Sequence, residues 1–205
     1  MIFGLAIRLR IGETPEFEAS RTAKTSPPRA PILSTLRDGW KGLLLGIGLN
    51  LAPFGAFYLV NTFLLFYLTN NVGVPRSEAL VGQFVVSIVQ ATTLLPIAIL
   101  ADRYGAKRIA AIGCAILVLV GYPLFAIAET GRIIPLAFIV AIATLGMTAV
   151  HAVCASIIPM QFEIHYRYTA SSLAYHLNAV IAGAIVPIAA TASVDWLGGS
   201  FMGAV

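Results

Sequence analysis

Five long apolar segments constrain the fold of this chain more than any other feature of its sequence. They occupy residues 42–69, 79–101, 109–128, 133–158 and 169–193. Each is long enough to cross a bilayer as a tilted helix, which needs about 20 predominantly apolar residues. A spanning segment must also satisfy its own backbone polar groups, and a helix does so. The sequence therefore predicts an all-α, polytopic membrane protein with about five transmembrane helices.

The composition supports this interpretation and excludes others. Of the 205 residues, 59% are hydrophobic and 11% are charged, whereas about 25% are charged in a typical soluble domain. The net charge of +4 does not indicate a nucleic-acid partner, because the basic residues crowd the ends of apolar segments and act as topology signals in a lipid bilayer. Cys114 and Cys154 lie inside apolar segments without metal-ligand spacing, so we expect neither a metal site nor a cofactor.

The basic residues are distributed unequally between the two sides of the predicted membrane. All but two of the 13 Lys and Arg residues fall on one side, and the exceptions are Arg76 and Arg132. This asymmetry assigns the richer side to the cytoplasm. It predicts a multi-pass protein whose N-terminus is cytoplasmic.

A short charged turn separates the second and third apolar segments. Asp102, Arg103, Lys107 and Arg108 place four charges within seven residues, and Gly105 permits a tight backbone turn. Asp102 can accept hydrogen bonds from the free amides of a neighbouring helix N-terminus. The basic side chains can pair with carboxylates of another loop or with anionic lipid headgroups. The alternative is that these charges only fix the topology.

Polar side chains fall on one face of four of the five predicted spans. These candidate cavity-lining residues are Asn50, Phe54, Tyr58 and Asn61 in the first span, Gln83, Ser87 and Gln90 in the second, Thr144, Thr148 and His151 in the fourth, and Ser172 and His176 in the fifth. The third span has almost no polar face and is expected to face lipid. We therefore interpret the four faces as the walls of a wet cavity. The alternative is that the polar groups only bond across helices, and that His176 is a packing residue and not a proton carrier.

Several stretches resemble a known family in order and spacing. The segment Leu100-Ala-Asp-Arg-Tyr-Gly-Ala-Lys-Arg108 resembles the Gly-x-Leu-Ala-Asp-Arg-x-Gly-Arg-Lys signature of major facilitator superfamily transporters. The stretches Glu13–Phe17, Asn61–Thr69, Arg167–Tyr175 and Gly183–Pro187 resemble segments of its metabolite:proton symporters, which include α-ketoglutarate, citrate, shikimate and proline/betaine permeases. Between the fourth and fifth spans, the sequence from Pro159 to Ala170 resembles the family's gating loop and contains Glu163 and Arg167.

The resemblance implies the C-terminal half of a twelve-helix bundle in a bacterial inner membrane. Residues 1–41 would hold the end of a sixth helix and a cytoplasmic inter-half linker. Residues 42–205 would form the C-terminal-half bundle, with a further span truncated at its start. In such transporters the substrate lies between the two halves near the bilayer midplane. The missing N-terminal half would then be a partner of this chain, and the charged turn around Gly105 would latch the two halves together.

Three functions compete at this point. The first is symport of a proton with a small organic acid or osmolyte by alternating access, by a chain that is an incomplete fragment. The second is a residual or accessory membrane protein that moves no solute. A membrane-embedded enzyme is the weakest, because His151 and His176 alone do not make an active site. We therefore predict a transporter that is not an enzyme.

Overall fold

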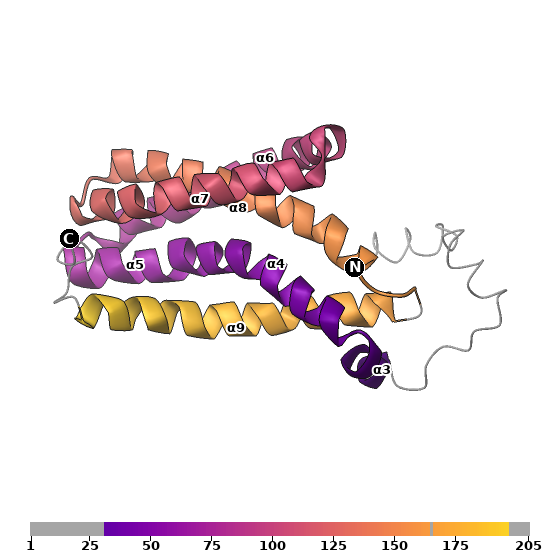
Figure 1. The fold of residues 1–205 in the computed structure, drawn as a ribbon. Coiled ribbons are helices and arrows are strands. Elements are labelled where there is room, and N and C mark those ends of the chain that lie inside the picture. Colours follow the sequence, from indigo (N-terminus) through magenta and orange to yellow (C-terminus); the bar gives the residue numbers. More distant parts are fainter. Residues whose placement is uncertain (1–30, 165, 197–205) are drawn as a thin grey trace, which may run out of the picture.

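The computed structural model describes residues 31–164 and 166–196, and these residues form helices and no strand (Figure 1). The elements are α3 (Pro31–Asp38), α4 (Trp40–Tyr58), η1 (Leu59–Phe63), α5 (Leu64–Tyr67), η2 (Leu68–Val72), α6 (Arg76–Tyr104), α7 (Ala106–Glu129), α8 (Ile133–Met160) and α9 (Arg167–Trp196). The expected end of a sixth helix, most of the expected linker and the expected start of a further span lie outside the described residues. The all-α prediction is confirmed for the part that the structure describes.

Among the described residues, five helical stretches are long and apolar enough to span a membrane, as predicted. They run over Trp40–Val72, Arg76–Tyr104, Ala106–Glu129, Ile133–Met160 and Arg167–Trp196. The first is a continuous 33-residue stretch in which the α-helical segments alternate with the π-helical segments η1 and η2. A π-helical segment accommodates an additional residue in a turn and is often found at functional sites.

One helix was not predicted. The residues Pro31–Asp38 were assigned to a linker, but they form α3, and Thr35 on this helix is fully buried. The backbone N–H of Gly39 donates to the carbonyl oxygen of Thr35 at 3.0 Å. A helix of about two turns is weakly signalled by sequence, because its stability comes from packing and not from local propensity.

The helices form two groups that meet along α8. In Figure 1, the stretch from α4 to α5 runs beside α9, while α6 and α7 lie beside α8. One hydrophobic cluster joins α5, η2, α6, α7 and α8, with Val86, Leu124 and Val140 among its buried members. A second cluster joins α4, α8 and α9 through residues such as Leu43, Cys154 and Ala174. Helix α8 contributes to both clusters and is the most buried of the five spans.

The backbones of α7 and α8 approach each other closely at two glycines. A Cβ atom added at Gly113 would lie 2.7 Å from the carbonyl oxygen of Gly146, and one added at Gly146 would lie 2.9 Å from the carbonyl oxygen of Gly113. Small residues at a crossing let two backbones meet, which is the usual way to increase van der Waals contact between helices in a membrane. The opposite side of α7 exposes Ile112, Val118 and Leu119, in keeping with a face that meets lipid.

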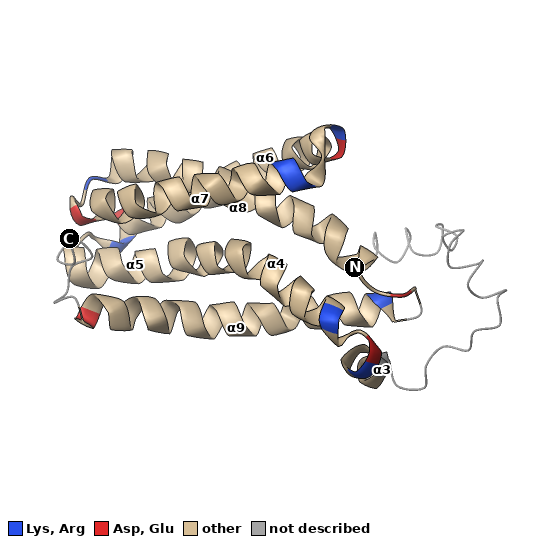
Figure 2. Cartoon of the chain, in the orientation of Figure 1, with Lys and Arg blue, Asp and Glu red and all other residues tan. Residues whose placement is uncertain are grey.

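In the described part of the chain, Lys, Arg, Asp and Glu lie at the two ends of the bundle and not in its middle (Figure 2). The turn at Gly105 and the helix α3 lie at the same end, which we call the hairpin end. At the opposite end, the hydroxyl of Tyr67 donates a hydrogen bond of 3.0 Å to Oε1 of Glu129, tying α5 to the end of α7. The acidic group is thereby held at the rim of the bundle, where water can solvate it.

Candidate functional site

The charged turn at the hairpin end is as tight as the sequence predicts. Gly105 alone separates α6 from α7, and its φ of +97° is a conformation that L side chains rarely adopt. Its N–H donates to the carbonyl oxygen of Ala101 at 3.0 Å, and its own carbonyl accepts from the N–H groups of Arg108 and Ile109 at 3.1 and 3.3 Å. The side chains of Asp102, Arg103, Lys107 and Arg108 are all exposed. The turn therefore presents four charges to whatever lies beyond this end, and its role as a latch stays a prediction.

The loop between α8 and α9 is packed, unlike the charged turn. The rings of Phe162 and Tyr166 are buried, and a Cβ atom added at Gly42 would lie 2.9 Å from Phe162. Arg167 donates from Nε to the carbonyl oxygen of Phe162 at 3.1 Å, while Glu163 is exposed. Burial, together with the carboxylates of Glu163 and Asp38, raises the pKa of the Tyr166 phenol above its usual range. The predicted gating role of Glu163 and Arg167 stays a prediction.

Four of the predicted cavity-lining residues border two adjoining cavities among α4, α6, α8 and α9. The first cavity, of about 130 Å³, is lined by Asn50, His151, Cys154, Ala155, Ile158, Pro159, Ser171 and Tyr175. The second, of about 160 Å³, is lined by Pro53, Phe54, Phe57, Gln90, Met147, His151 and Tyr175. His151 and Tyr175 border both, so they form the wall between them. None of the described residues that line either cavity is Asp, Glu, Lys or Arg.

Three rings form the centre of this site. Phe54 and Tyr175 meet edge to face with centroids 4.9 Å apart, and the ring of His151 lies 6.0 Å from Phe54 and 6.5 Å from Tyr175. Edge-to-face contacts of this kind hold aromatic side chains in fixed orientations. The rings come from α4, α8 and α9, so the site depends on the packing of three separate spans.

Two buried amides lie beside the rings at the α4–α9 contact. Asn50 and Asn178 are 1% and 0% exposed, and in the described part of the chain no hydrogen-bond partner is found for Nδ2 of Asn50 or for either polar atom of the Asn178 side chain. They sit at the same level of the two helices, one turn beyond the contact of Gly46 with Ala174, where an added Cβ atom would lie 3.2 Å from the alanine Cβ. A buried amide without a partner costs roughly 1–3 kcal/mol. Asn50 Nδ2 therefore retains an unused donor beside the first cavity.

The remaining predicted residues of the first and second spans make helix contacts. Gln83 donates from Nε2 to the carbonyl oxygen of Asn61 at 2.5 Å, and Asn61 donates from Nδ2 to Phe57 within its own helix at 3.1 Å. Ser87 donates to the carbonyl oxygen of Gln83 at 2.9 Å. The ring of Tyr58 faces Gly183, where an added Cβ atom would lie 2.8 Å from it. These residues join α4 and η1 to α6 and α9, and a role in solute contact stays a prediction.

In the fourth span, two predicted hydroxyls are satisfied locally. Thr144 donates to the carbonyl oxygen of Val140 at 2.8 Å, and Thr148 donates to that of Thr144 at 2.7 Å. Both side chains are buried. Hydrogen bonds to the preceding turn are a common way to hold a threonine inside a helix, so these residues fit the alternative of a packing role.

In the fifth span, the structure brings different residues to the site from those that were predicted. Ser171 and Tyr175 line the first cavity, whereas Ser172 and His176 come one position later, about 100° around the helix. His176 is exposed, and its ring packs edge to face against Tyr175 at 5.7 Å. Sequence reasoning missed Ser171, Tyr175 and Asn178. The spacing of four between Ser171 and Tyr175, which places them on one helix face, was the available signal.

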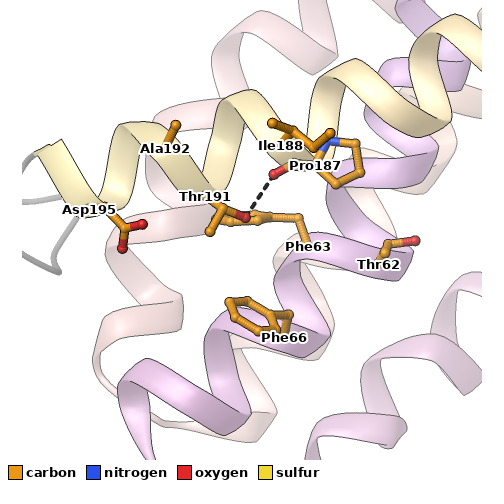
Figure 3. A pocket seen from close by; sticks show the side chains of 8 residues that line it. All are labelled: Thr62, Phe63, Phe66, Pro187, Ile188, Thr191, Ala192 and Asp195. Atoms are coloured by element: carbon orange, nitrogen blue, oxygen red, sulfur yellow. Dashed lines mark hydrogen bonds between the residues drawn. The ribbon is translucent and has the colours of Figure 1, made fainter.

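A larger cavity lies elsewhere, towards the end opposite the hairpin end. It measures about 490 Å³ and is lined by Thr62, Phe63, Phe66, Pro187, Ile188, Thr191, Ala192 and Asp195. Figure 3 shows the hydroxyl of Thr191 directed to the carbonyl oxygen of Pro187, to which it donates at 2.8 Å. The threonine donor is thus already used, and the lining is mostly apolar. The two smaller cavities gather more free polar groups and are the better candidate for a solute site.

The amino-acid sequence of this chain matches a known protein family. The family model described as Major Facilitator Superfamily matches residues 8–204. The chain belongs to the Major Facilitator Superfamily. With its five membrane-length helices, this superfamily member is a multi-pass membrane protein. No solved structure matches the chain.

Curated relatives of this chain are named as transporters. The shikimate transporter of Escherichia coli is 28% identical over 96% of this chain and 45% of its own length. The ectoine/proline transporter of Corynebacterium glutamicum is 24% identical over 91% of this chain and 39% of its own length. The proline/betaine transporter of E. coli is 26% identical over 92% and 39%. This chain thus spans less than half the length of these relatives.

Proposed function

We propose that this chain forms the C-terminal half of a secondary transporter in a bacterial inner membrane, which moves a small organic acid or osmolyte together with a proton by alternating access. Membership of the superfamily and the names of the relatives support transport of a small solute. The observation that carries the proposal is the pair of cavities that share His151 and Tyr175. They collect an unused amide donor, a histidine and a tyrosine inside the spans, where polar groups are costly and typically functional.

The charges at the hairpin end support a cytoplasmic location for that end. Arg37, Lys41, Arg103, Lys107, Arg108 and Arg167 lie there, against Arg76 and Arg132 at the opposite end. With this orientation, the exposed carboxylate of Asp102 and its basic neighbours meet the other half of the transporter. They act as a latch in the state that is closed to the cytoplasm, because charged groups at a helix end can pair across two loops and separate again in water.

Proton coupling in this proposal depends on the rest of the transporter. The acidic residues in the described part of the chain lie at or near span ends, as Glu78, Glu129 and Asp195 do. A carboxylate that takes up and releases a proton within the membrane must then come from the other half. This chain supplies the neutral polar wall of the solute site and the cytoplasmic latch.

Uptake measurements test the proposal. Proteoliposomes that contain this chain together with the remainder of the transporter are given labelled shikimate, proline or glycine betaine, with and without an inward proton gradient. We expect gradient-dependent accumulation of one of these solutes, and its loss when a protonophore is added. Asn50→Leu should reduce uptake by about tenfold or more, because it removes the unused donor.

The control is Phe84→Leu, which changes a 69% exposed side chain on α6 and should leave uptake unchanged. Folded protein that accumulates none of the three solutes would contradict the transport proposal. Accumulation without a proton gradient would contradict proton coupling alone. Asp102→Asn should slow transport without weakening solute binding, and a change in binding instead would contradict the latch.

A further inference from the structure

We propose that α3, together with the first turn of α4, is a membrane-surface element that binds a lipid leaflet containing anionic phospholipids. The apolar side chains of α3 enter the leaflet at the hairpin end, while Arg37 and Lys41 meet the phosphates of the headgroups. This inference concerns a lipid partner of the chain and does not rest on the proposed solute site.

Helix α3 has the reverse polarity of a helix on the surface of a soluble protein. Such a helix buries its apolar stripe and exposes its polar residues. In α3, the side chain of Thr35 is fully buried, while those of Ile32, Leu33 and Leu36 are 57%, 66% and 51% exposed. These three side chains lie within an arc of about 100° around the helix axis. They form one apolar face, which acyl chains would cover more favourably than water.

The opposite side of α3 is fixed against the loop between α8 and α9. Thr35 and Gly39 are both buried. A Cβ atom added at Gly39 would lie 3.1 Å from Cε2 of Tyr166 and 3.1 Å from the carbonyl oxygen of Thr35. This contact decides which side of α3 packs against the protein, and it leaves the apolar face directed away from the bundle.

The position of α3 is that of an element at the boundary between bilayer and water. With eight residues it is far too short to cross a bilayer, which takes about 20. Figure 1 shows that it turns aside from α4 at the hairpin end. The exposed rings of Trp40, Tyr104 and Tyr168 lie at the same end, and tryptophan and tyrosine favour the membrane–water interface. The apolar face of α3 therefore lies beside an aromatic belt.

Basic side chains border this apolar face. Arg37 and Lys41 are exposed, as is the single nearby carboxylate of Asp38, and Nζ of Lys41 lies 5.7 Å from the centre of the Trp40 ring. At the hairpin end as a whole, the described residues include six basic and three acidic side chains, which leaves a positive charge (Figure 2). An anionic leaflet attracts basic groups beside the membrane, and their long stems can lie in the apolar layer while the charge stays among the phosphates.

The depth of a tryptophan placed on α3 tests whether this face meets lipid. The chain has two tryptophans, so Trp40→Phe with Trp196→Phe gives a background in which Leu33→Trp reports alone. In vesicles, we expect phospholipids brominated near the headgroup to quench this indole strongly, and aqueous acrylamide to quench it weakly. Leu36→Trp is a second probe with the same expectation. Glu163→Trp, at an exposed acidic position of the α8–α9 loop, is the water-facing control and should be quenched mainly by acrylamide.

A comparison of two brominated lipids tests the charge of the partner. Phosphatidylglycerol and phosphatidylcholine are each added in brominated form to the same mixed vesicles. We expect the anionic lipid to associate beside the Leu33→Trp probe about fivefold more strongly, the scale of one basic residue at an anionic surface. Arg37→Gln combined with Lys41→Gln should abolish this preference. Arg76→Gln combined with Arg132→Gln removes two charges at the opposite end and is the matched control, which should leave the preference unchanged.

The outcomes of these experiments separate this proposal from the proposed function. Quenching mainly by acrylamide would place α3 in water, and an indole reached by neither quencher would show that protein covers the face; either result overturns the proposal. Equal association of the two lipids, or a preference that survives the double substitution of Arg37 and Lys41, overturns the anionic partner. Circular dichroism shows whether each variant is folded. Solute uptake is measured separately, and its failure would leave the lipid contact of α3 intact.

Discussion

The two sides of α8 differ in how they are packed. Towards α7, the backbones at Gly113 and Gly146 are so close that no Cβ atom fits between them without a shift of the backbone. Towards α4 and α9, the same helix borders two cavities through His151 and Cys154. The comparison shows one helix with a close backbone contact at Gly146 on one side and two cavities with polar lining residues on the other. Packing against α7 stabilises the fold, and the side facing α4 and α9 is available for a ligand.

The largest expected change in stability comes from adding a methyl group where α7 meets α8. Gly113→Ala places a methyl group 2.7 Å from the carbonyl oxygen of Gly146 and 2.8 Å from Cγ2 of Val150. Because a backbone atom cannot move aside cheaply, we expect the free energy of unfolding to fall by about 1–3 kcal/mol. Thermal or denaturant unfolding in detergent measures this change.

Gly121→Ala is the matched control on the same helix. Among the described residues, nothing lies within 4 Å of a Cβ atom added at Gly121, so this variant should be neutral or slightly more stable because alanine favours a helix. Equal stability of the two variants would show that the α7–α8 contact can open. It would contradict the inference that α8 is packed more rigidly against α7 than against α4 and α9.

An intermediate effect of opposite sign is expected at the α4–α9 contact. Asn178→Leu replaces a fully buried amide, for which the described residues offer no partner, by an apolar side chain with the same branching and number of heavy atoms. We expect the free energy of unfolding to rise by about 1 kcal/mol, because the cost of the unpaired amide is removed.

Asn61→Leu is the control for Asn178→Leu, since the Asn61 amide donates to Phe57 and its replacement brings no such gain. The comparison uses the same unfolding assay. A loss of stability in Asn178→Leu would contradict the inference that this buried amide is unpaired in the folded protein.

The smallest change in stability is expected where an added methyl group meets a side chain that can move, and not a backbone atom. Gly183→Ala places a methyl group 2.8 Å from Cζ of Tyr58, almost as close as the contact at Gly113. The tyrosine ring can rotate away, so we expect a loss below about 1 kcal/mol. A loss as large as that of Gly113→Ala would show that the α4–α9 contact is as rigid as the α7–α8 contact.

Much of the architecture follows from local sequence. The spans were placed within a few residues of the helices observed, because a long apolar run that ends in charges is a signal that needs no tertiary information. The turn at Gly105 was equally local, since it depends on one residue with a positive φ. Helix α3 was missed because Thr35 and Gly39 are buried by contacts with distant parts of the chain.

The candidate site was predicted only in part. Asn50, Phe54, Gln90 and His151 were named and do line the paired cavities. On the fifth span, Ser172 and His176 were named in place of Ser171 and Tyr175. A span that is apolar almost all around gives little indication of which face packs inwards, and an error of one residue turns the predicted face by about 100°.

The sequence by itself determined the number of spans, their ends, the charge asymmetry and the tight turn, because each depends on residues that are neighbours in the chain. Only the tertiary structure decided that Gly113 meets Gly146, that Asn50 and Asn178 are buried at one level, and that Tyr175 forms a wall with Phe54 and His151. Those features depend on the rotation of each helix about its own axis. In a membrane that rotation is set by the fit of one helix surface against another.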